Sequence, residues 1–166
     1  MSRAFVRESD TETGAVPLLD RPISEHPNLV TARGMALIAR KVAEHRAALE
    51  AAHEAEDAEG EARASRELRY WSARQASAEI VEPDKDGKRV TFGAAVTLGH
   101  ADGTESRFRI VGEDEAEPAQ GRIAWPAPVA RALVGSELGD LVQLPTGEVE
   151  VLAIDPTPEE VPDEQE

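Results

Sequence analysis

Five acidic side chains within a run of eight residues form the densest group of chemically competent residues in this sequence. They are Glu54, Glu56, Asp57, Glu59 and Glu61. Carboxylates bind hard divalent cations and also pair with basic protein surfaces. The group therefore predicts a functional tip that meets a metal ion or a basic partner. The alternative is an exposed helix turn on an acidic protein, because acids are favoured at a helix start whatever their function.

The chain lacks the residues that other kinds of active site require. It has no cysteine, which excludes thiol catalysis, disulfides and thiolate metal sites. Its four histidines form no His-x-x-x-His pair, and it has neither a Gly-x-Ser-x-Gly elbow nor a phosphate-binding Gly-x-x-x-x-Gly-Lys loop. We therefore expect no intrinsic catalytic residue, no metal site and no cofactor of the protein's own.

The formal net charge of −15 over 166 residues restricts the class of partner. A phosphate backbone repels such a surface, so we expect no direct sequence-specific binding of DNA or RNA. No stretch approaches the ~20 apolar residues of a membrane span, and the first residues lack the apolar core of a signal peptide. These features predict a cytoplasmic protein that does not bind membranes.

Two helices with heptad apolar spacing are expected to position the acidic tip. With Thr31 as the predicted N-cap, the first seam is Met35, Ile38, Val42, His45, Leu49 and Ala52. His45 is interpreted as a half-buried spacer rather than a metal ligand. The pattern fails in the acidic run around Gly60, which predicts the turn there. It resumes at Ala64, Leu68, Trp71, Gln75 and Ala78.

This spacing predicts a second helix from about Ala62 to Ile80 and an antiparallel coiled-coil hairpin over residues 30–82. The rod would be ~30–40 Å long at 1.5 Å per residue. The second helix also carries a basic stripe, which either pairs with Glu44, Glu50 and Glu67 inside the hairpin or contacts an acidic wall or RNA. The stripe consists of Arg63, Arg66, Arg69 and Arg74.

The apolar period changes from helical to strand-like beyond a linker at residues 83–87. Alternation predicts five strands, at residues 90–98, 106–111, 121–125, 141–144 and 148–154. Pro128 opens a short helix that Gly135 ends. The fold class is therefore expected to be α+β, with the hairpin followed by a small antiparallel sheet with one helix over residues 88–155.

Both ends of the chain are polar and rich in proline. Residues 1–29 are interpreted as a flexible arm, and residues 156–166 as an acidic disordered tail. The arm contains one apolar patch, Val16, Leu18 and Leu19, which is either disordered or docked on the folded body or on a partner.

Four segments of the C-terminal half resemble, in order, the C-terminal domain of the GreA/GreB transcript-cleavage factors. They are Val90–Leu98, Arg109–Ala116, Pro128–Gly135 and Gly139–Val142. The Val-Thr-Ala-Arg-Gly sequence at residues 30–34 resembles the start of the coiled coil of that family. The resemblance covers residues 30–155.

This resemblance implies an FKBP-like domain that docks on the rim of the secondary channel of bacterial RNA polymerase, with the hairpin inserted in the channel. In that family, acids at the hairpin tip help to hold a second Mg²⁺ at the polymerase active site, so that backtracked RNA is cleaved. A factor of that family, without the polymerase, is not a nuclease. We accordingly expect a monomer that regulates elongation, with Mg²⁺ shared with the polymerase.

The resemblance also suggests which residues dock on the polymerase. They are Asp114, Glu115, Trp125, Pro126, Ala127, Pro128 and Arg131. Pro126 and Ala127 stand where the family has polar residues, so a more apolar contact is expected.

The tip departs from the family pattern in order and in reach. Nothing at residues 54–61 matches Asp-Leu-x-Glu-Asn-Ala-Glu-Tyr, and the hairpin is shorter by roughly two turns per arm, or ~10 Å. A metal ligand must lie within ~2–2.6 Å of its ion. Either the tip still promotes cleavage, or the short rod occupies the channel without cleavage and competes with true Gre factors.

Two interpretations that do not involve RNA polymerase remain open. The chain could be an acidic interaction module with a different partner. A prolyl isomerase, by analogy of fold alone, is disfavoured because only Phe92, Phe108 and Trp125 could line its pocket.

Overall fold

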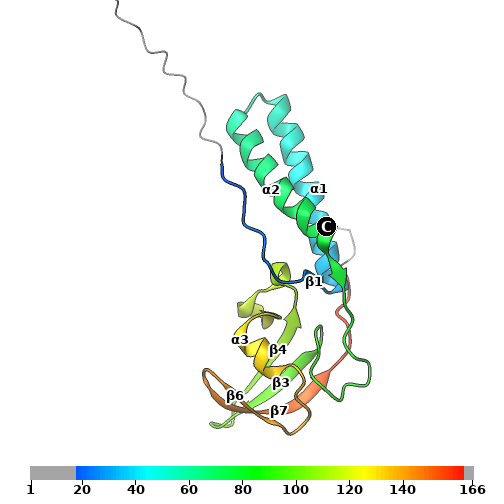
Figure 1. The fold of residues 1–166 in the computed structure, drawn as a ribbon, viewed down its shortest axis with the longest axis vertical. Coiled ribbons are helices and arrows are strands. Elements are labelled where there is room, and N and C mark those ends of the chain that lie inside the picture. Colours follow the sequence, from blue (N-terminus) through cyan, green and yellow to red (C-terminus); the bar gives the residue numbers. More distant parts are fainter. Residues whose placement is uncertain (1–17, 163–166) are drawn as a thin grey trace, which may run out of the picture.

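A helical hairpin stands on a small β-domain in the computed structural model, which describes residues 18–162 (Figure 1). The hairpin consists of α1 (Ala32–Glu54) and α2 (Ala58–Ser77). At 1.5 Å per residue, the 23 residues of α1 span ~35 Å, within the predicted range. The expected α+β class is confirmed.

The predicted heptad seam holds the two helices together. Ile38, Val42 and Trp71 are buried between them, with Met35 and Leu68 packed against this cluster. His45 is half-buried on the same stripe, as its interpretation as a spacer requires. Thr31 caps α1 by accepting a hydrogen bond from the Gly34 amide at 3.0 Å.

The turn of the hairpin lies a few residues earlier than predicted. Residues 55–57 connect the helices, and α2 begins at Ala58 rather than Ala62. The reason is that Asp57 caps α2, accepting a hydrogen bond from the Gly60 amide at 2.9 Å, so Gly60 lies in the first helical turn. Glu56 reverses the chain in the left-handed conformation, with φ of 53°.

Two short parallel strands close the base of the hairpin. They are β1 (Leu29–Val30) and β2 (Glu79–Ile80), which follow the arm and α2 respectively. The second helix therefore ends at Ser77, before the predicted Ile80, because residues 79–80 extend to pair with β1. The Asn28 side chain donates to the Arg74 carbonyl at 2.8 Å and ties the arm to the end of α2.

Five strands form the sheet of the β-domain in the order β5-β4-β3-β7-β6. Their bounds are β3 Ala95–His100, β4 Glu105–Val111, β5 Arg122–Ala124, β6 Leu141–Leu144 and β7 Gly147–Asp155. Three of the four pairings are antiparallel, as expected, and β4 with β5 is parallel. The chain returns to run parallel because two short 3₁₀ helices, η1 (Glu113–Glu115) and η2 (Pro118–Gln120), separate these strands.

The first strand of the sheet begins at Ala95, not at the predicted Val90. Val90 instead bonds to the segment after the short helix, accepting from the Gly135 amide at 2.8 Å and donating to the Ser136 carbonyl at 2.9 Å. Gly93 then turns the chain with φ of 84°. The alternation before residue 95 therefore reflects burial against that segment rather than a strand.

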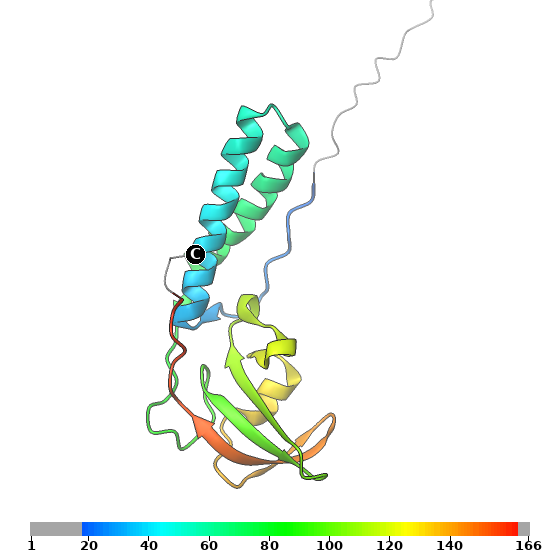
Figure 2. The ribbon, with the colours of Figure 1, turned by 180° about the vertical axis from the view of Figure 1, so that it is seen from behind.

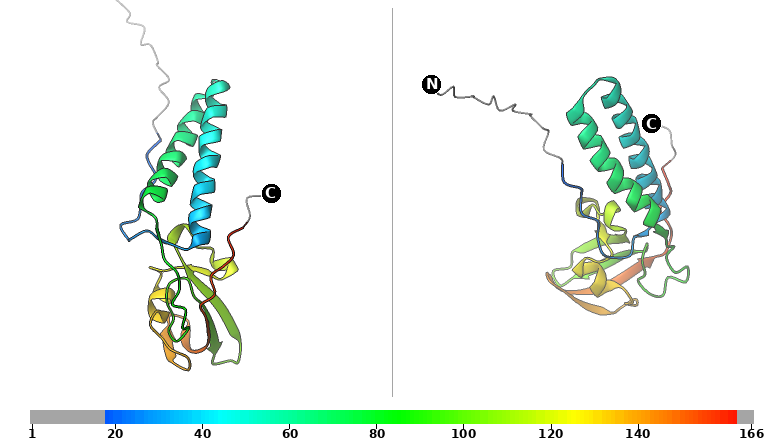
Figure 3. Two further views of the ribbon diagram at one scale, coloured as in Figure 1. Left: turned by 90° about the vertical axis from the view of Figure 1, so that its right-hand side faces the viewer. Right: turned by 45° about the horizontal axis from the view of Figure 1, so that its top comes forward.

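One face of the sheet is covered by α3 (Pro128–Leu133). Ala130 and Leu133 pack there on Val96, Leu98 and Ile110, all fully buried. Successive residues of a strand point to opposite faces, so Arg107 and Arg109 of β4 lie on the face that α3 does not cover. Figure 3 shows the yellow helix on one side of the curled sheet.

The described parts of both ends run along the folded body, as Figure 2 shows from behind. Residues 18–28 pass beside α2, where the Arg66 Nε donates to the Leu19 carbonyl at 2.6 Å. Leu18 and Leu19 are nevertheless exposed, so this part of the apolar patch does not dock; Val16 lies outside the described residues. Residues 156–162 follow β7 without regular structure, and residues 163–166 lie outside the description.

No helix within residues 18–162 has the length and apolar character needed to cross a membrane.

The cap on α2 can be tested separately from the charge of its side chain. Asp57→Ala should lower the free energy of unfolding by about 1 kcal/mol, because the Gly60 amide loses its acceptor. Asp57→Asn keeps an acceptor oxygen and should cost only a few tenths of a kcal/mol by comparison. Urea unfolding followed by far-ultraviolet circular dichroism measures both. Equal losses would contradict the capping role.

Candidate functional site

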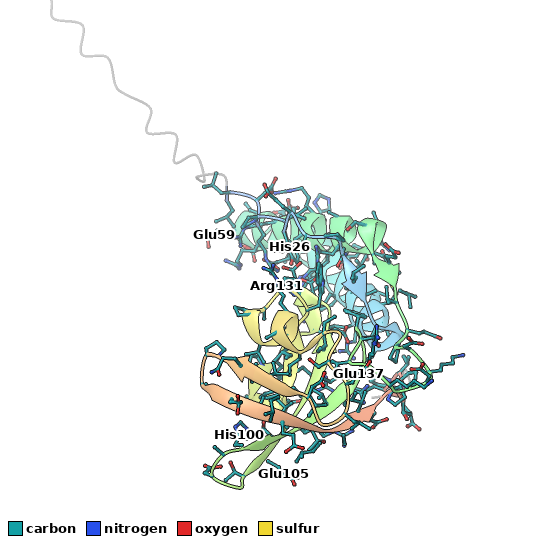
Figure 4. All side chains as sticks on the ribbon, turned by 60° about the horizontal axis from the view of Figure 1, so that its bottom comes forward. His26, Glu59, His100, Glu105, Arg131 and Glu137 are labelled. Atoms are coloured by element: carbon teal, nitrogen blue, oxygen red, sulfur yellow. The ribbon has the colours of Figure 1, made fainter. Side chains whose placement is uncertain are left out.

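The structure gathers the five acids of the tip at the end of the hairpin farthest from the sheet. Figure 4 labels Glu59 there, at the opposite end of the view from His100 and Glu105 on the β-domain. Glu61 pairs with His53 at 2.9 Å, and Glu59 lies 3.6 Å from Arg63. Asp57 is the cap of α2. Three of the five acids therefore have partners within the hairpin, and Glu54 and Glu56 are exposed.

The acids of the tip are not arranged as a metal site. Within residues 18–162, no group of three or more His, Asp or Glu side chains is placed to hold a metal ion. Carboxylates at the tip could supply at most part of the coordination shell of an ion held mainly by another protein.

The basic stripe of α2 pairs inside the protein, with one of the predicted partners, Glu67, and with others that were not predicted. Arg69 binds Asp20 of the arm at 2.6 Å, and Arg66 lies 3.4 Å from Glu67 of the same helix. Glu67 also binds Arg21 of the arm at 2.6 Å. The arm takes these partners because residues 18–28 pass directly beside α2.

Arg74, the last member of the stripe, joins the hairpin to the β-domain. Its side chain is only 2% exposed, and its Nε donates to Asp114 Oδ2 at 2.6 Å. The other oxygen of Asp114 accepts from the Tyr70 hydroxyl at 2.5 Å. Glu113 adds a second carboxylate 3.7 Å from the guanidinium. One carboxylate of η1 thus holds two side chains from adjacent turns of α2.

The carboxylate of Glu115, the last residue of η1, holds the start of α1. The Glu115 side chain is 1% exposed and accepts from the Thr31 hydroxyl at 2.7 Å. Gly34 lies so close to this carboxylate that a Cβ at that position would overlap it. Gly112 likewise leaves no room for a Cβ beside the Leu29 carbonyl. We call these contacts of η1 with Thr31, Tyr70 and Arg74 the interdomain joint.

The structure places Asp114 and Glu115, which the sequence suggests as docking residues, in the interdomain joint. Both side chains are turned into the protein and have internal partners. In this structure they position the hairpin, and their side chains are 7% and 1% exposed. Sequence reasoning missed the pairing because Arg74 and Asp114 are 40 residues apart and no local pattern links them.

The other five docking candidates lie on one continuous segment, residues 125–131, which consists of the residues before α3 and the first turn of that helix. We call this segment the docking loop. Pro128 and Arg131 are exposed at the start of α3, whereas Trp125, Pro126 and Ala127 are half-buried. The Trp125 ring meets the edge of His26 of the arm, with centroids 5.7 Å apart. Trp125 Nε1 is buried and has no hydrogen-bond partner among the described residues. The arm therefore contacts the docking loop, which no sequence signal indicated.

Residues 84–156 match the family model described as "Transcription elongation factor, GreA/GreB, C-term". Within the curated proteins, the chain is 42% identical over 106 residues to the transcription elongation factor GreA of Anaeromyxobacter sp. (strain K), covering 60% of this chain and 62% of that protein. Residues 84–156 are therefore similar to the C-terminal domain of the transcription elongation factors GreA and GreB. The resemblance found in the sequence is thereby confirmed.

A second curated relative and a solved structure are also similar to parts of this chain. The transcription elongation factor GreB of Neisseria meningitidis serogroup A is 38% identical over 96 residues, covering 54% of this chain and 59% of that protein. The chain thus spans about three fifths of the length of these curated relatives. A solved structure, the GreA factor homolog 1 (Gfh1) protein of Thermus thermophilus, matches 78% of this chain with a TM-score of 0.37 and 22% identity.

The matched GreA/GreB domain contains both η1 and the docking loop, whereas the hairpin tip lies outside residues 84–156. The match to the family model therefore covers the β-domain and does not include the tip.

The single tyrosine of the chain reports on the interdomain joint. Burial and the hydrogen bond and negative charge of Asp114 raise the pKa of Tyr70 to about 12 from its ordinary 10.0. Because the folded pKa is raised, the stabilisation is complete below pH ~10 and is lost as the pH rises towards 12. Tyrosinate absorbance should therefore titrate near 12 in the folded protein.

Asp114→Asn should move this titration of Tyr70 towards its ordinary pKa, since the negative charge is removed while burial remains. The control is Glu113→Gln, which removes a neighbouring charge of η1 that does not contact the phenol. An equal shift in both variants would contradict the specific contact between Asp114 and Tyr70.

Proposed function

We propose that this protein regulates transcription elongation by binding bacterial RNA polymerase, with its hairpin inserted in the secondary channel. Relatives of the matched domain carry the names of transcription elongation factors GreA and GreB. The observation that carries the proposal is the interdomain joint, because a hairpin can act at a distance from a docking surface only if its direction is fixed. Arg74 and Glu115, both almost fully buried, supply that constraint from the two helices and η1.

The docking loop is the proposed contact with the polymerase. It offers an exposed cation, Arg131, beside the exposed ring of Pro128 and the partly exposed Trp125. Arginine and tryptophan dominate the binding energy of many protein interfaces when they become desolvated. The loop lies in the same domain as η1, so a partner held at α3 would set the direction of the hairpin.

The hairpin is proposed to act as a rod that occupies the channel rather than as a catalytic finger. Asp57, Glu59 and Glu61 already have partners within the hairpin. Among the five acids of the tip, only Glu54 and Glu56 are exposed without a described partner. Two carboxylates supply a small part of the six oxygens that Mg²⁺ requires. On this proposal the protein has no activity of its own and competes with factors that promote cleavage.

Removal of the exposed cation of the docking loop should weaken binding to the polymerase. We expect Arg131→Ala to raise the dissociation constant about tenfold, the size of effect usual for a significant interface arginine. Lys85→Ala removes the same charge from the exposed linker and should leave the affinity unchanged. Fluorescence anisotropy with labelled protein and purified core polymerase measures both.

A failure of the wild-type protein to bind polymerase at micromolar concentration would reject the proposed partner. The acidic interaction module with a different partner would then be the better interpretation. Equal effects of the two substitutions would instead reject the docking loop as the contact.

An RNA-cleavage assay on a backtracked elongation complex distinguishes a hairpin that only occupies the channel from one that promotes cleavage. We expect the wild-type protein to give no RNA cleavage above that of polymerase alone and to inhibit cleavage promoted by an authentic GreA. Glu56→Gln/Asp57→Asn/Glu59→Gln should inhibit equally, because the side-chain shapes and the cap on α2 are kept while three charges are removed. Stimulation by the wild type that this variant loses would contradict the rod and establish cleavage.

A further inference from the structure

A cavity of about 300 Å³ lies on the face of the sheet opposite α3. Three arginines line it. Arg107 and Arg109 are two residues apart on β4 and therefore point to the same face, and Arg122 on β5 is the direct cross-strand neighbour of Arg109. No part of the polymerase-binding proposal uses this cavity.

Two like charges in register on neighbouring strands repel one another. The side chains of Arg109 and Arg122 are each only 14% exposed, so water screens that repulsion less than it would on an open surface. An anion between the two guanidinium groups would relieve this repulsion. The arrangement is unusual for a chain whose formal net charge is −15, because acidic groups predominate elsewhere.

The anion in this structure comes from the chain's own C-terminal segment. Glu159 Oε1 accepts from Arg122 Nη2 at 2.5 Å, and its second oxygen lies 3.9 Å from Arg109 Nε. Arg109 Nη1 also donates to the backbone carbonyl of Thr157 at 3.0 Å. Asp155 binds Arg107 at 2.9 Å. The arginines therefore hold the end of β7 and the acidic segment after it, through the carboxylates of Asp155 and Glu159 and the carbonyl of Thr157.

The fit of this segment is incomplete. Arg122 Nε and Glu159 Oε2 are both buried and lack a hydrogen-bond partner among the described residues. The contact of 3.9 Å between Glu159 and Arg109 is too long for a hydrogen bond. Buried polar groups without partners are costly, so a ligand that accepted a hydrogen bond from Arg122 Nε would remove a cost that the contact with Glu159 leaves.

We propose that the cavity of Arg107, Arg109 and Arg122 is a binding site for an acidic, extended segment of a partner protein, for which residues 155–159 of this chain compete. A peptide is favoured over a nucleic acid because Arg109 already binds a peptide backbone carbonyl, a group that a nucleic-acid backbone lacks. The site is distinct from the docking loop and does not depend on the hairpin entering the polymerase.

The test uses the full-length chain and a fluorescent synthetic peptide with the sequence of residues 156–166. The internal segment acts at an effective concentration that can reach the millimolar range, so the wild-type chain should bind the peptide weakly. Glu159→Gln weakens the internal competitor and should tighten peptide binding by about tenfold or more. Glu160→Gln removes the same charge from an exposed neighbour and should behave as the wild type. Equal affinities in the two variants would overturn the proposal.

Two further binding measurements identify the chemistry of the ligand. A peptide with Gln in place of Glu159 should bind the Glu159→Gln chain at least several-fold more weakly than the native peptide, and equal binding would overturn the carboxylate site. Adding Arg122→Gln to the Glu159→Gln chain should abolish binding, with circular dichroism confirming that the fold is kept. If that variant unfolds, the comparison of Glu159→Gln with Glu160→Gln still decides, because both keep every arginine.

Other occupants of the cavity give different results. Displacement of the peptide by pyrophosphate or single-stranded RNA at lower concentrations than by unlabelled peptide would overturn the proposal in favour of a phosphate ligand. Sedimentation of the wild-type chain as a dimer that Glu159→Gln converts to a monomer would assign the cavity to a second copy of this chain, and would overturn it too.

Discussion

The buried ion pair between Arg74 and Asp114 is the interaction on which the relation of hairpin to β-domain depends. Desolvating two charges is costly, and the cost is offset only where the geometry is good and the remaining polar atoms are satisfied. Here Asp114 also accepts from Tyr70, and Glu113 lies beside the guanidinium. Because a displaced hairpin would leave these charges buried without partners, the pair selects one orientation of the helices.

Several other features of the molecule follow from that orientation. Glu115 can cap the start of α1 through Thr31 only because Gly34 and Gly112 allow the backbones of the two parts to approach. The arm reaches both parts at once, with Ser24 donating to Glu113 at 2.9 Å and His26 against Trp125. The arm therefore connects the docking loop, through His26, with η1, through Ser24.

Acidic residues serve three different purposes in this chain, and their surroundings decide which. At the tip they are exposed and partly paired within the hairpin. In the joint Asp114 and Glu115 are buried structural anchors. At the outer face of the sheet Glu159 fills a cavity of arginines. Composition alone could not separate these roles, because a carboxylate is costly or favourable to bury according to the cations and donors that meet it.

Much of the fold could be predicted from the sequence because helices and strands impose local periods. Heptad spacing identified the seam of Ile38, Val42 and Trp71, and alternation identified most of the strands. The GreA/GreB motifs indicated the resemblance of the C-terminal domain through their residue types and their order along the chain. The tertiary structure decided what depends on contacts distant in sequence: the parallel β5, the internal use of Asp114 and Glu115, and the meeting of Glu159 with Arg122. Periodicity reports which face of an element is buried, but the partner of a buried charge is set by packing between elements 37 or 40 residues apart.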